Sequence, residues 1–298
     1  MSPHGGNLPG SNLPQKALVL GGKNGLLGRA VAAALAETDV EVLAASSADV
    51  DYFDAEALDD FLDEHEPGCI INAVGHTQVD RCEDEPEEAF RLNASLPALL
   101  GVLAGERGLK LVHYSTDFVF DGKKGAPYLP SDAANPLSVY GASKLAGEEA
   151  LLALDVPGLL ILRTAWLFGP GKMNFVRRIL DLAAERPELR VVDDQHGSPT
   201  CTTDLGRMTV ELLRAGVDGL FHTVNSGETT WFGLASEALR LAGLSCPVLP
   251  IPTSEYPTRA ARPPYSVLDV SDYVRATGSR PRHWKEALAE YVASLPKT

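Results

Sequence analysis

The stretch Lys16-Ala17-Leu18-Val19-Leu20-Gly21-Gly22-Lys23-Asn24-Gly25-Leu26-Leu27-Gly28 decides the fold of this 298-residue chain. Its apolar start predicts a buried strand, and Ala, Leu and Val residues at helical spacing continue to Leu35. The glycines between these segments allow a tight turn, close approach of the backbone to a pyrophosphate, and close helix–strand packing. The following helix would direct its N-terminus at the phosphates. The stretch therefore predicts a dinucleotide site, and the alternative is a purely structural turn.

Strands and helices alternate through the rest of the N-terminal half. A helix is expected over 55–64 and another from the charged run Glu83–Glu88 to Leu103, and further strands at 40–45, 69–74, 111–117, 158–163 and 220–224. This alternation predicts an α/β fold, a Rossmann-type doubly wound parallel sheet with helices on both faces. The proline-rich C-terminal part predicts a smaller, partly irregular substrate-binding lobe over the carboxyl edge of the sheet.

The expected domain organisation has three parts. Residues 1–14 form a flexible leader, and residues 15–165 form the dinucleotide-binding domain, to which 195–225 returns. Residues 166–194 and 226–298 form the substrate-binding lobe.

The composition limits the classes of partner. The formal net charge is −14, which argues against a nucleic-acid or anionic-membrane binder because such proteins depend on Lys and Arg. No apolar run approaches the ~18 residues of a membrane span. The four cysteines, Cys69, Cys82, Cys201 and Cys246, show neither metal nor disulfide spacing. Free thiols in a reducing, cytoplasmic location are expected, with no metal.

Tyr140 and Lys144 are the candidate catalytic pair. They lie four residues apart in a predicted helix, so they share a face one turn apart. A nearby ammonium favours the phenolate, and such a tyrosine can exchange a proton with a substrate oxygen. Thr116, at the end of a predicted strand, could direct a hydroxyl at the same oxygen. A Tyr-x-x-x-Lys pair alone is usually a half-buried Tyr beside a solvated Lys, so the interpretation depends on the upstream glycine turn.

The end of the second strand bears on the choice of cofactor. An NAD site often has Asp or Glu there, but this chain has Ser46-Ser47. Lys23 could reach a 2′-phosphate, so NADPH is favoured and NADH remains possible. The alternative is that Lys23 is solvated and the serines cap a turn. His76, after the third strand, could be a base but is more simply a loop residue near the cofactor.

Taken in order, these motifs resemble the extended short-chain dehydrogenase/reductases. Longer runs are similar to the dTDP-4-dehydrorhamnose reductase family: residues 73–80, 112–122, 135–148, 163–166, 194–200 and 256–263. The similarity covers nearly all of the chain after the leader.

The resemblance implies a reaction and a set of site residues. The C4 ketone of dTDP-4-dehydrorhamnose would be reduced to dTDP-L-rhamnose, with Tyr140 as proton donor, Lys144 tuning it and holding the nicotinamide ribose, and Thr116 completing the triad. The expected cofactor-binding residues are Gly22, Lys23, Asn24, Gly25, Leu26, Leu27, Gly28, Ser46, Asp51, Gly75, His76, Thr77, Tyr140 and Lys144. The expected substrate-binding residues are Thr116, Asp117, Trp166 and Arg262.

Some positions depart from the family pattern. Ala30 stands where some members have a Glu used in a magnesium-linked dimer, so the chain is expected to be a monomer or a homodimer without metal. Phe118 and His196 stand where Tyr is usual. Two alternatives stay open: a non-catalytic NADP-binding homologue resembling the regulatory subunit of methionine adenosyltransferase, and a reductase or epimerase of another nucleotide sugar. The presence of Thr116, Tyr140 and Lys144 argues against the first.

Overall fold

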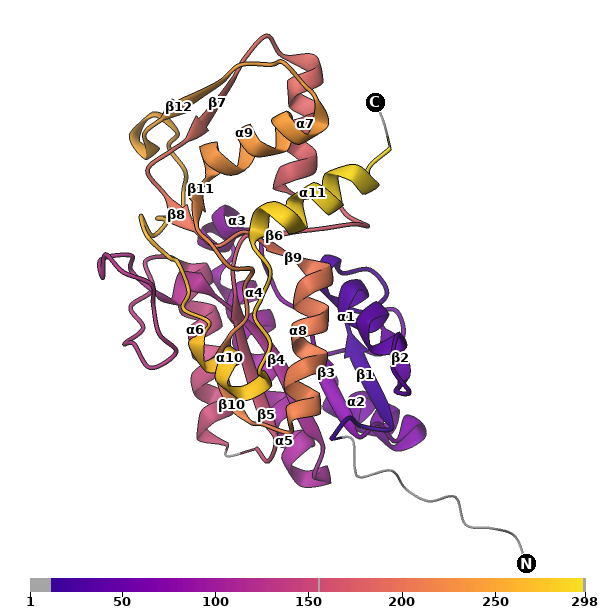
Figure 1. Cartoon of the computed structure of the whole chain (residues 1–298). Helices are drawn as coiled ribbons and strands as arrows, with labels where there is room; N and C mark the ends of the chain where they lie inside the picture. Colours follow the sequence, from indigo (N-terminus) through magenta and orange to yellow (C-terminus); the bar gives the residue numbers. More distant parts are fainter. Residues whose placement is uncertain (1–11, 155, 297–298) are drawn as a thin grey trace, which may run out of the picture.

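The computed structural model describes residues 12–154 and 156–296, and its centre is a six-stranded parallel sheet (Figure 1). The strand order is β10-β5-β4-β3-β1-β2, and every neighbouring pair is parallel. The strands are β1 (Lys16–Leu20), β2 (Glu41–Ala45), β3 (Cys69–Asn72), β4 (Lys110–Thr116), β5 (Leu159–Thr164) and β10 (Gly219–His222). The doubly wound sheet expected from the sequence is confirmed.

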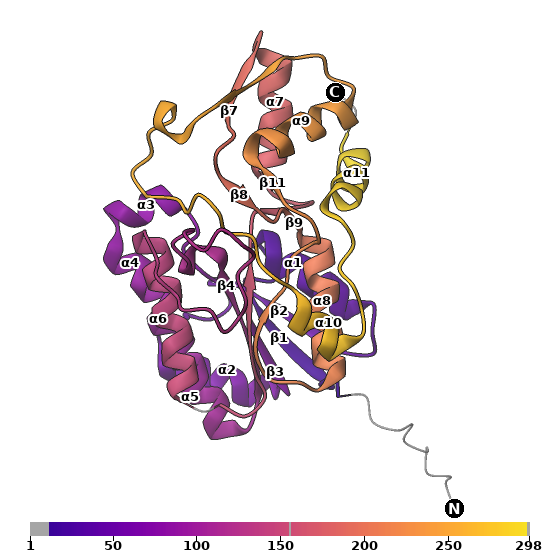
Figure 2. The same cartoon turned by 60° about the vertical axis from the view of Figure 1, so that its left-hand side comes forward.

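Helices cover both faces of this sheet (Figure 2). One face packs against α1 (Leu26–Ala36), α8 (Thr202–Ala215) and α10 (Ser271–Thr277). The other packs against α2 (Ala55–His65), α5 (Leu96–Arg107) and α6 (Val139–Ala153). The central strands are buried from both sides, which explains their continuous apolar runs.

The order of the strands places the site. Strand β2 lies on one side of β1 and β3 on the other, so the strand order reverses between β1 and β3, which is the switch point of the sheet. In open parallel sheets a ligand crevice forms at the carboxyl ends beside such a point. The glycine turn after β1, the loop after β3 and the end of β4 therefore meet at one edge.

The helix expected from Glu83 is interrupted. The chain forms α3 (Val79–Asp84), then α4 (Pro86–Phe90), then a π-helical turn at Arg91–Ser95 that runs into α5. Pro86 cannot continue α3 because it lacks an amide hydrogen, but it suits the first turn of α4. The prediction of a single helix was therefore wrong at its start. A π-helical turn is often found at a functional site.

A smaller lobe lies beyond the carboxyl edge (Figure 1). Its helices α7 (Phe175–Glu185), α9 (Trp231–Ala242) and α11 (Trp284–Ser294) share an apolar core. Its strand pairs are β6 (Leu167–Phe168) with β9 (Thr200–Cys201), β7 (Leu189–Val192) with β12 (Val248–Ile251), and β8 (His196–Gly197) with β11 (Thr229–Thr230). A short 3-10 helix spans Thr253–Glu255. Strand β12 lies in the stretch expected to be loops, where Pro250 is tolerated at an edge.

Two segments differ from the expected division of the chain. Helix α10, expected in the smaller lobe, packs on α8 and the sheet through buried Tyr273. Residues 1–11 of the expected leader lie outside the described part, but Asn12 is bound to the domain: its side-chain amide donates to the Arg214 carbonyl at 3.0 Å. Lys110 donates to the Asn12 carbonyl at 2.6 Å. The division into lobes otherwise stays a prediction.

Candidate active site

The glycine turn after β1 leaves no room for a side chain at Gly22 or Gly28. A Cβ atom on Gly28 would lie 2.3 Å from the Gly21 carbonyl oxygen, and one on Gly22 would lie 2.8 Å from the Val19 carbonyl. Helix α1 begins at Leu26, and its N-cap residue Gly25 supplies no side-chain hydrogen bond. The amide groups of the first turn are therefore available to an anion. This geometry fits the pyrophosphate of a dinucleotide.

The end of β2 holds a carboxylate that the sequence argument overlooked. The Asp49 carboxylate accepts from the Ser46 amide at 2.8 Å and from the Ser46 hydroxyl at 2.7 Å, and it pairs with Lys23. The hydrogen bond from Lys23 and those from Ser46 lower the pKa of Asp49 to about 2. The premise that no acidic group stands at this strand end was wrong, because a turn brings Asp49 back over Ser46.

Asp51 and Tyr52 lie next to this turn. The Asp51 carboxylate accepts from the Phe53 amide at 3.0 Å, so it closes a local turn. The Tyr52 hydroxyl, which the sequence argument did not single out, accepts from the Gly21 amide at 3.4 Å. Tyr52 therefore links the second strand region to the glycine turn.

Asn93, in the π-helical turn, organises the loop after β3. Its amide oxygen accepts from the His76 amide at 2.9 Å, and its amide nitrogen donates to the His76 carbonyl at 3.1 Å and the Ser143 hydroxyl at 2.9 Å. A Cβ on Gly75 would lie 2.9 Å from the Asn93 oxygen and 4.0 Å from Lys144 Nζ. The loop is thus fixed at His76, and Gly75 lies directly beside Lys144.

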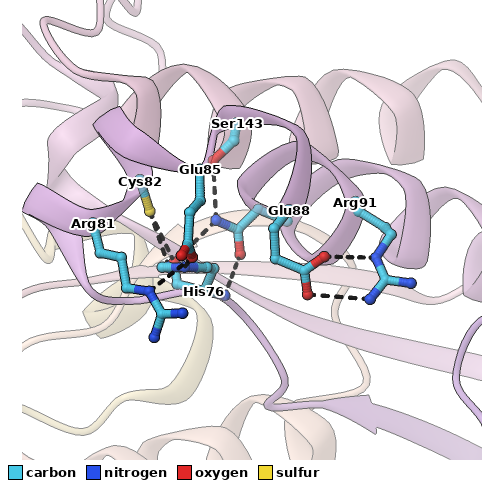
Figure 3. Close-up of polar contacts among 8 residues, drawn as sticks. His76, Arg81, Cys82, Glu85, Glu88, Arg91 and Ser143 are labelled. Atoms are coloured by element: carbon cyan, nitrogen blue, oxygen red, sulfur yellow. Dashed lines mark hydrogen bonds and ion pairs between the residues drawn. The ribbon is translucent and has the colours of Figure 1, made fainter.

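The His76 ring is turned toward α3 (Figure 3). Its Nδ1 lies 3.1 Å from Cys82 Sγ, and its Nε2 lies 3.4 Å from a Glu85 oxygen that Arg81 also contacts at 2.8 Å. Burial raises the pKa of Cys82 to about 11, so the group is a thiol. These contacts engage both ring nitrogens of His76, which favours the loop role over the base role.

Tyr140 and Thr116 meet at the carboxyl edge of β4. Both side chains are buried, and the Thr116 hydroxyl lies close enough to the Tyr140 phenol to influence its pKa. The Phe118 ring packs edge-on against Tyr140, with centroids 5.6 Å apart. Burial, and then the charge of Asp117, raise the pKa of Tyr140 above its ordinary value. Tyr140 is therefore a phenol here, as a proton donor requires.

Lys144 is held by β4 rather than by Tyr140. Its Nζ donates to the Tyr114 carbonyl at 2.5 Å and lies 3.2 Å from His113 Nε2. Burial lowers the pKa of Lys144 to about 8, against the charge of Glu148. The sequence predicted that the Lys144 ammonium lies near the Tyr140 phenol. In the structure its hydrogen-bond partners are instead groups of β4.

Asn72 assigns the tautomer of His113. The Asn72 amide oxygen accepts from the Val74 amide at 3.1 Å, so its nitrogen is the atom 3.2 Å from His113 Nδ1. With Nδ1 accepting, the neutral imidazole carries its hydrogen on Nε2, facing Lys144. That contact is a hydrogen bond only when Lys144 is a neutral amine, which agrees with the lowered pKa of Lys144.

Asp117 lies beside the triad with its carboxylate engaged. It accepts from the Ser266 hydroxyl at 2.5 Å and from the Thr116 hydroxyl at 3.0 Å. Burial raises its pKa to about 6, against these hydrogen bonds. The structure thus brings Asp117 to the site, where its partners are protein hydroxyls.

Trp166 and Arg262 also have protein partners. The Trp166 ring stacks on Trp231 with centroids 3.6 Å apart, and its backbone has a φ of +48°. Arg262 donates to both carboxylate oxygens of Asp80, at 3.1 and 2.7 Å. Arg262 therefore joins the smaller lobe to α3, and a substrate contact by Arg262 stays a prediction.

Asn93 and Ser266 were not predicted as site residues from the sequence, and both reach the site through contacts with residues distant in the chain. Asn93 carried a signal, since a helix-disfavouring Asn interrupts an otherwise apolar helical run. Ser266 carried none, because it contacts Asp117 across 149 positions of the chain.

Within 12–154 and 156–296, no three His, Cys, Asp or Glu side chains gather closely enough to hold a metal ion. Ala30 lines a shallow cavity of about 220 Å³ between Arg29 and Arg207. Among the same residues, no helix has the length and apolar character needed to span a membrane.

Comparison with known proteins agrees with this geometry. The family model described as RmlD substrate binding domain matches residues 16–296. A dTDP-4-dehydrorhamnose reductase of Streptomyces griseus is 37% identical, over 96% of this chain and 96% of its own length. The chain belongs to the RmlD family.

Two further members are informative. A dTDP-4-keto-6-deoxy-D-glucose reductase of Streptomyces niveus is 38% identical, over 90% of this chain and 94% of its own. The structure of a dTDP-4-dehydrorhamnose reductase from Bacillus anthracis in complex with NADP superposes with a TM-score of 0.90 at 32% identity, covering 95% of this chain and all of that one. The family resemblance expected from the sequence is thereby confirmed.

Proposed function

We propose that this protein reduces the C4 ketone of dTDP-4-dehydrorhamnose to dTDP-L-rhamnose with NADPH, and that Tyr140 donates the proton. The observation that carries this proposal is that Thr116, Tyr140 and Lys144 are all buried around the carboxyl end of β4. The glycine turn after β1 opens at the same edge. Family members of 37% and 38% identity are named as 4-keto nucleotide-sugar reductases, which supports the reaction class.

The site fits a nicotinamide dinucleotide. The uncapped start of α1 would hold the pyrophosphate, and residues 75–77, whose His76 backbone is held by Asn93, would lie along the nicotinamide half. Lys144, 4.0 Å from a Cβ placed on Gly75, would hold the nicotinamide ribose. When bound, NADPH supplies the hydride. The Bacillus anthracis relative was solved with NADP, which supports NADPH as the preferred form, with NADH possible.

The chain supplies orientation and proton handling. Tyr140 is kept as a phenol by burial, so it can give its proton to the carbonyl oxygen as negative charge develops there. Thr116 lies beside that phenol at the end of β4, where its hydroxyl would help to place the same substrate oxygen. Asp117 and Trp166 border the place where the sugar would lie, and Arg262 holds the smaller lobe against α3.

The second candidate is reduction of a different 4-keto nucleotide sugar. It is favoured by the Streptomyces niveus relative, whose name gives another sugar at similar identity. A non-catalytic regulatory role would leave the buried triad without a use. A cytoplasmic location, a monomer or homodimer, and no nucleic-acid partner remain our expectations.

The test is NADPH oxidation against a panel of 4-keto nucleotide sugars that differ in base and sugar. We expect the highest kcat/KM with dTDP-4-dehydrorhamnose, and product analysis should show dTDP-L-rhamnose. Turnover only with another panel member would replace the substrate and keep the reaction class. Cofactor binding without turnover of any member would overturn the proposal in favour of the regulatory role.

A further inference from the structure

The Trp166 side chain is held from two sides where the smaller lobe meets the sheet. Its indole stacks on that of Trp231, with ring centroids 3.6 Å apart and an interplanar angle of 7°. Another part of the same ring lies over Gly197, where an added Cβ atom would come within 2.4 Å of it. Trp231 and Gly197 together therefore restrict where the Trp166 indole can lie.

The backbone of Trp166 is also strained. Its φ of +48° is unusual for a non-glycine residue. Among the residues that the structure describes, Glu66 is the other non-glycine residue with a positive φ, and it ends α2. Trp166 ends no helix but follows β5, two positions after Thr164, whose register partner is Thr116. Backbone strain of this kind is concentrated at ligand-binding sites, so it favours a binding role for Trp166 over simple packing.

The two stacked indoles differ in their hydrogen bonds. The Trp231 N–H donates to the Gln195 side-chain oxygen at 3.1 Å, and the Gln195 amide donates to the Thr253 hydroxyl at 3.0 Å. These bonds fix Trp231 within the smaller lobe. Within 12–154 and 156–296, no group accepts from the Trp166 N–H, and this nitrogen is not buried. Trp166 therefore keeps a donor that a ligand can use.

We propose that Trp231 is a positioning residue for substrate binding: it fixes the Trp166 indole so that its N–H donates to an oxygen of the nucleotide sugar. This inference rests on the proposed function, which places the sugar nucleotide beside Trp166. Trp231 acts only through Trp166. Because α9 begins at Trp231, the first turn of a helix of the smaller lobe helps to set the affinity for the substrate.

Loss of the stack should weaken substrate binding selectively. Trp231→Leu keeps an apolar side chain but removes the ring, so the KM for the nucleotide sugar should rise by about two- to tenfold, the range for one aromatic pair. The kcat and the NADPH affinity should stay within about twofold of wild type. Trp231→Phe keeps a ring on Trp166 and should recover most of the loss. A partly unfolded preparation would instead lower kcat and leave KM unchanged.

A second measurement needs no turnover. The chain has three tryptophans, so ¹⁵N-indole labelling of the full-length protein gives three N–H signals, which single Trp→Phe variants assign. Saturating dTDP-L-rhamnose should shift the Trp166 signal and leave that of Trp284 unchanged. In Trp231→Leu the Trp166 signal should move even without ligand, and calorimetry should show the same two- to tenfold rise in Kd for dTDP-L-rhamnose.

Two further variants frame this test. Gly197→Ala displaces the Trp166 indole from its other side, so it should raise the Kd in the same way. Phe232→Leu is the matched control, because it removes a ring from the next position of α9, in an apolar cluster that does not contain Trp166.

The outcomes are separable. An unchanged Kd in Trp231→Leu, an equal loss in Phe232→Leu, or a Trp166 signal that does not respond to dTDP-L-rhamnose would overturn the inference. Should Trp231→Leu not fold, Gly197→Ala and the wild-type titration decide it. Binding of dTDP-L-rhamnose without turnover of any keto sugar would remove the proposed function and leave the inference standing. Neither binding nor turnover would overturn both.

Discussion

Tyr140 illustrates how burial selects the chemistry of a side chain. A buried phenol resists ionisation because the charged form loses its hydration, and the nearby Asp117 charge adds to this effect. A reductase needs a proton donor at this place, so the raised pKa agrees with the proposed direction of reaction. The placement of the triad residues was predictable from the sequence, because Thr116 ends a strand and Tyr140 and Lys144 lie one turn apart in a helix that follows a glycine turn further upstream.

The first prediction concerns this proton. Tyr140→Phe removes one oxygen and keeps the ring packed against Phe118. General acid catalysis contributes ~10²–10⁴-fold, so kcat should fall by about that range. NADPH affinity, measured by fluorescence titration, should change little. A near-normal kcat on the keto sugar would show that the proton comes from elsewhere.

The second prediction concerns Lys144, whose folded-state pKa of about 8 lies below its ordinary 10.5. Between pH 8 and pH 10.5 the unfolded chain binds more protons at Lys144 than the folded protein does. The free energy of unfolding therefore increases as the pH rises through this range. Lys144→Met should be more stable than wild type at pH 7, by up to about 3 kcal/mol. That difference should shrink from pH 8 to pH 10.

Urea denaturation of both proteins at each pH measures this difference. Subtraction removes the groups that titrate equally in both. A constant difference between pH 7 and pH 10 would mean that Lys144 is fully protonated in the folded state, and that the His113 tautomer was assigned wrongly.

At the scale of elements, the sequence predicted strands and helices correctly where the hydrophobic periodicity is strong. It predicted them poorly where a single residue ends a helix or forms a turn. Pro86 ends the run from α3 and opens α4, which composition alone does not reveal. The Asp49 turn is similar: a residue three positions beyond Ser46 folds back to supply the acidic group that the strand end lacked. Such turns depend on side-chain hydrogen bonds, which hydrophobic periodicity does not reveal.

The third prediction follows from that turn. Lys23 and the Asp49 carboxylate form an ion pair beside the glycine turn, where an adenosine ribose would lie. Lys23→Ala leaves Asp49 unpaired, so NADPH should lose more affinity than NADH, because the free carboxylate repels a 2′-phosphate. Asp49→Asn should do the opposite and raise the NADPH preference.

Ratios of kcat/KM for the two cofactors test both variants. Both residues are substantially exposed, so changes of about two- to fivefold are expected. Equal losses for NADPH and NADH in Lys23→Ala would show that this pair lies away from the 2′ position.

At the scale of the molecule, side-chain contacts between residues far apart in the chain join the smaller lobe to the nucleotide-binding part. Ser266 bonds to Asp117, Arg262 bonds to Asp80, and Arg259 pairs with Asp84 of α3. Helix α3 also carries Cys82, which contacts His76 (Figure 3). The sequence predicted a cleft between two lobes, but these pairs span 149 to 182 positions, and no local pattern specifies them.

The fourth prediction separates two roles for Arg262. The family resemblance implies a substrate contact. In the structure the guanidinium instead donates to both Asp80 carboxylate oxygens and to the Ala260 carbonyl, with the Arg262 side chain 21% and the Asp80 side chain 44% exposed. If Arg262 acts by closing the lobes, Asp80→Ala and Arg262→Ala should each raise the KM for the nucleotide sugar by about three- to fivefold, the range for a partly exposed pair. The double variant should be no worse than either, because each change removes the same interaction.

NADPH affinity should stay unchanged, and Arg240→Ala, which breaks an exposed pair with Glu237 elsewhere, is the matched control. A large loss in Arg262→Ala beside a normal Asp80→Ala would instead show that the guanidinium binds the substrate directly.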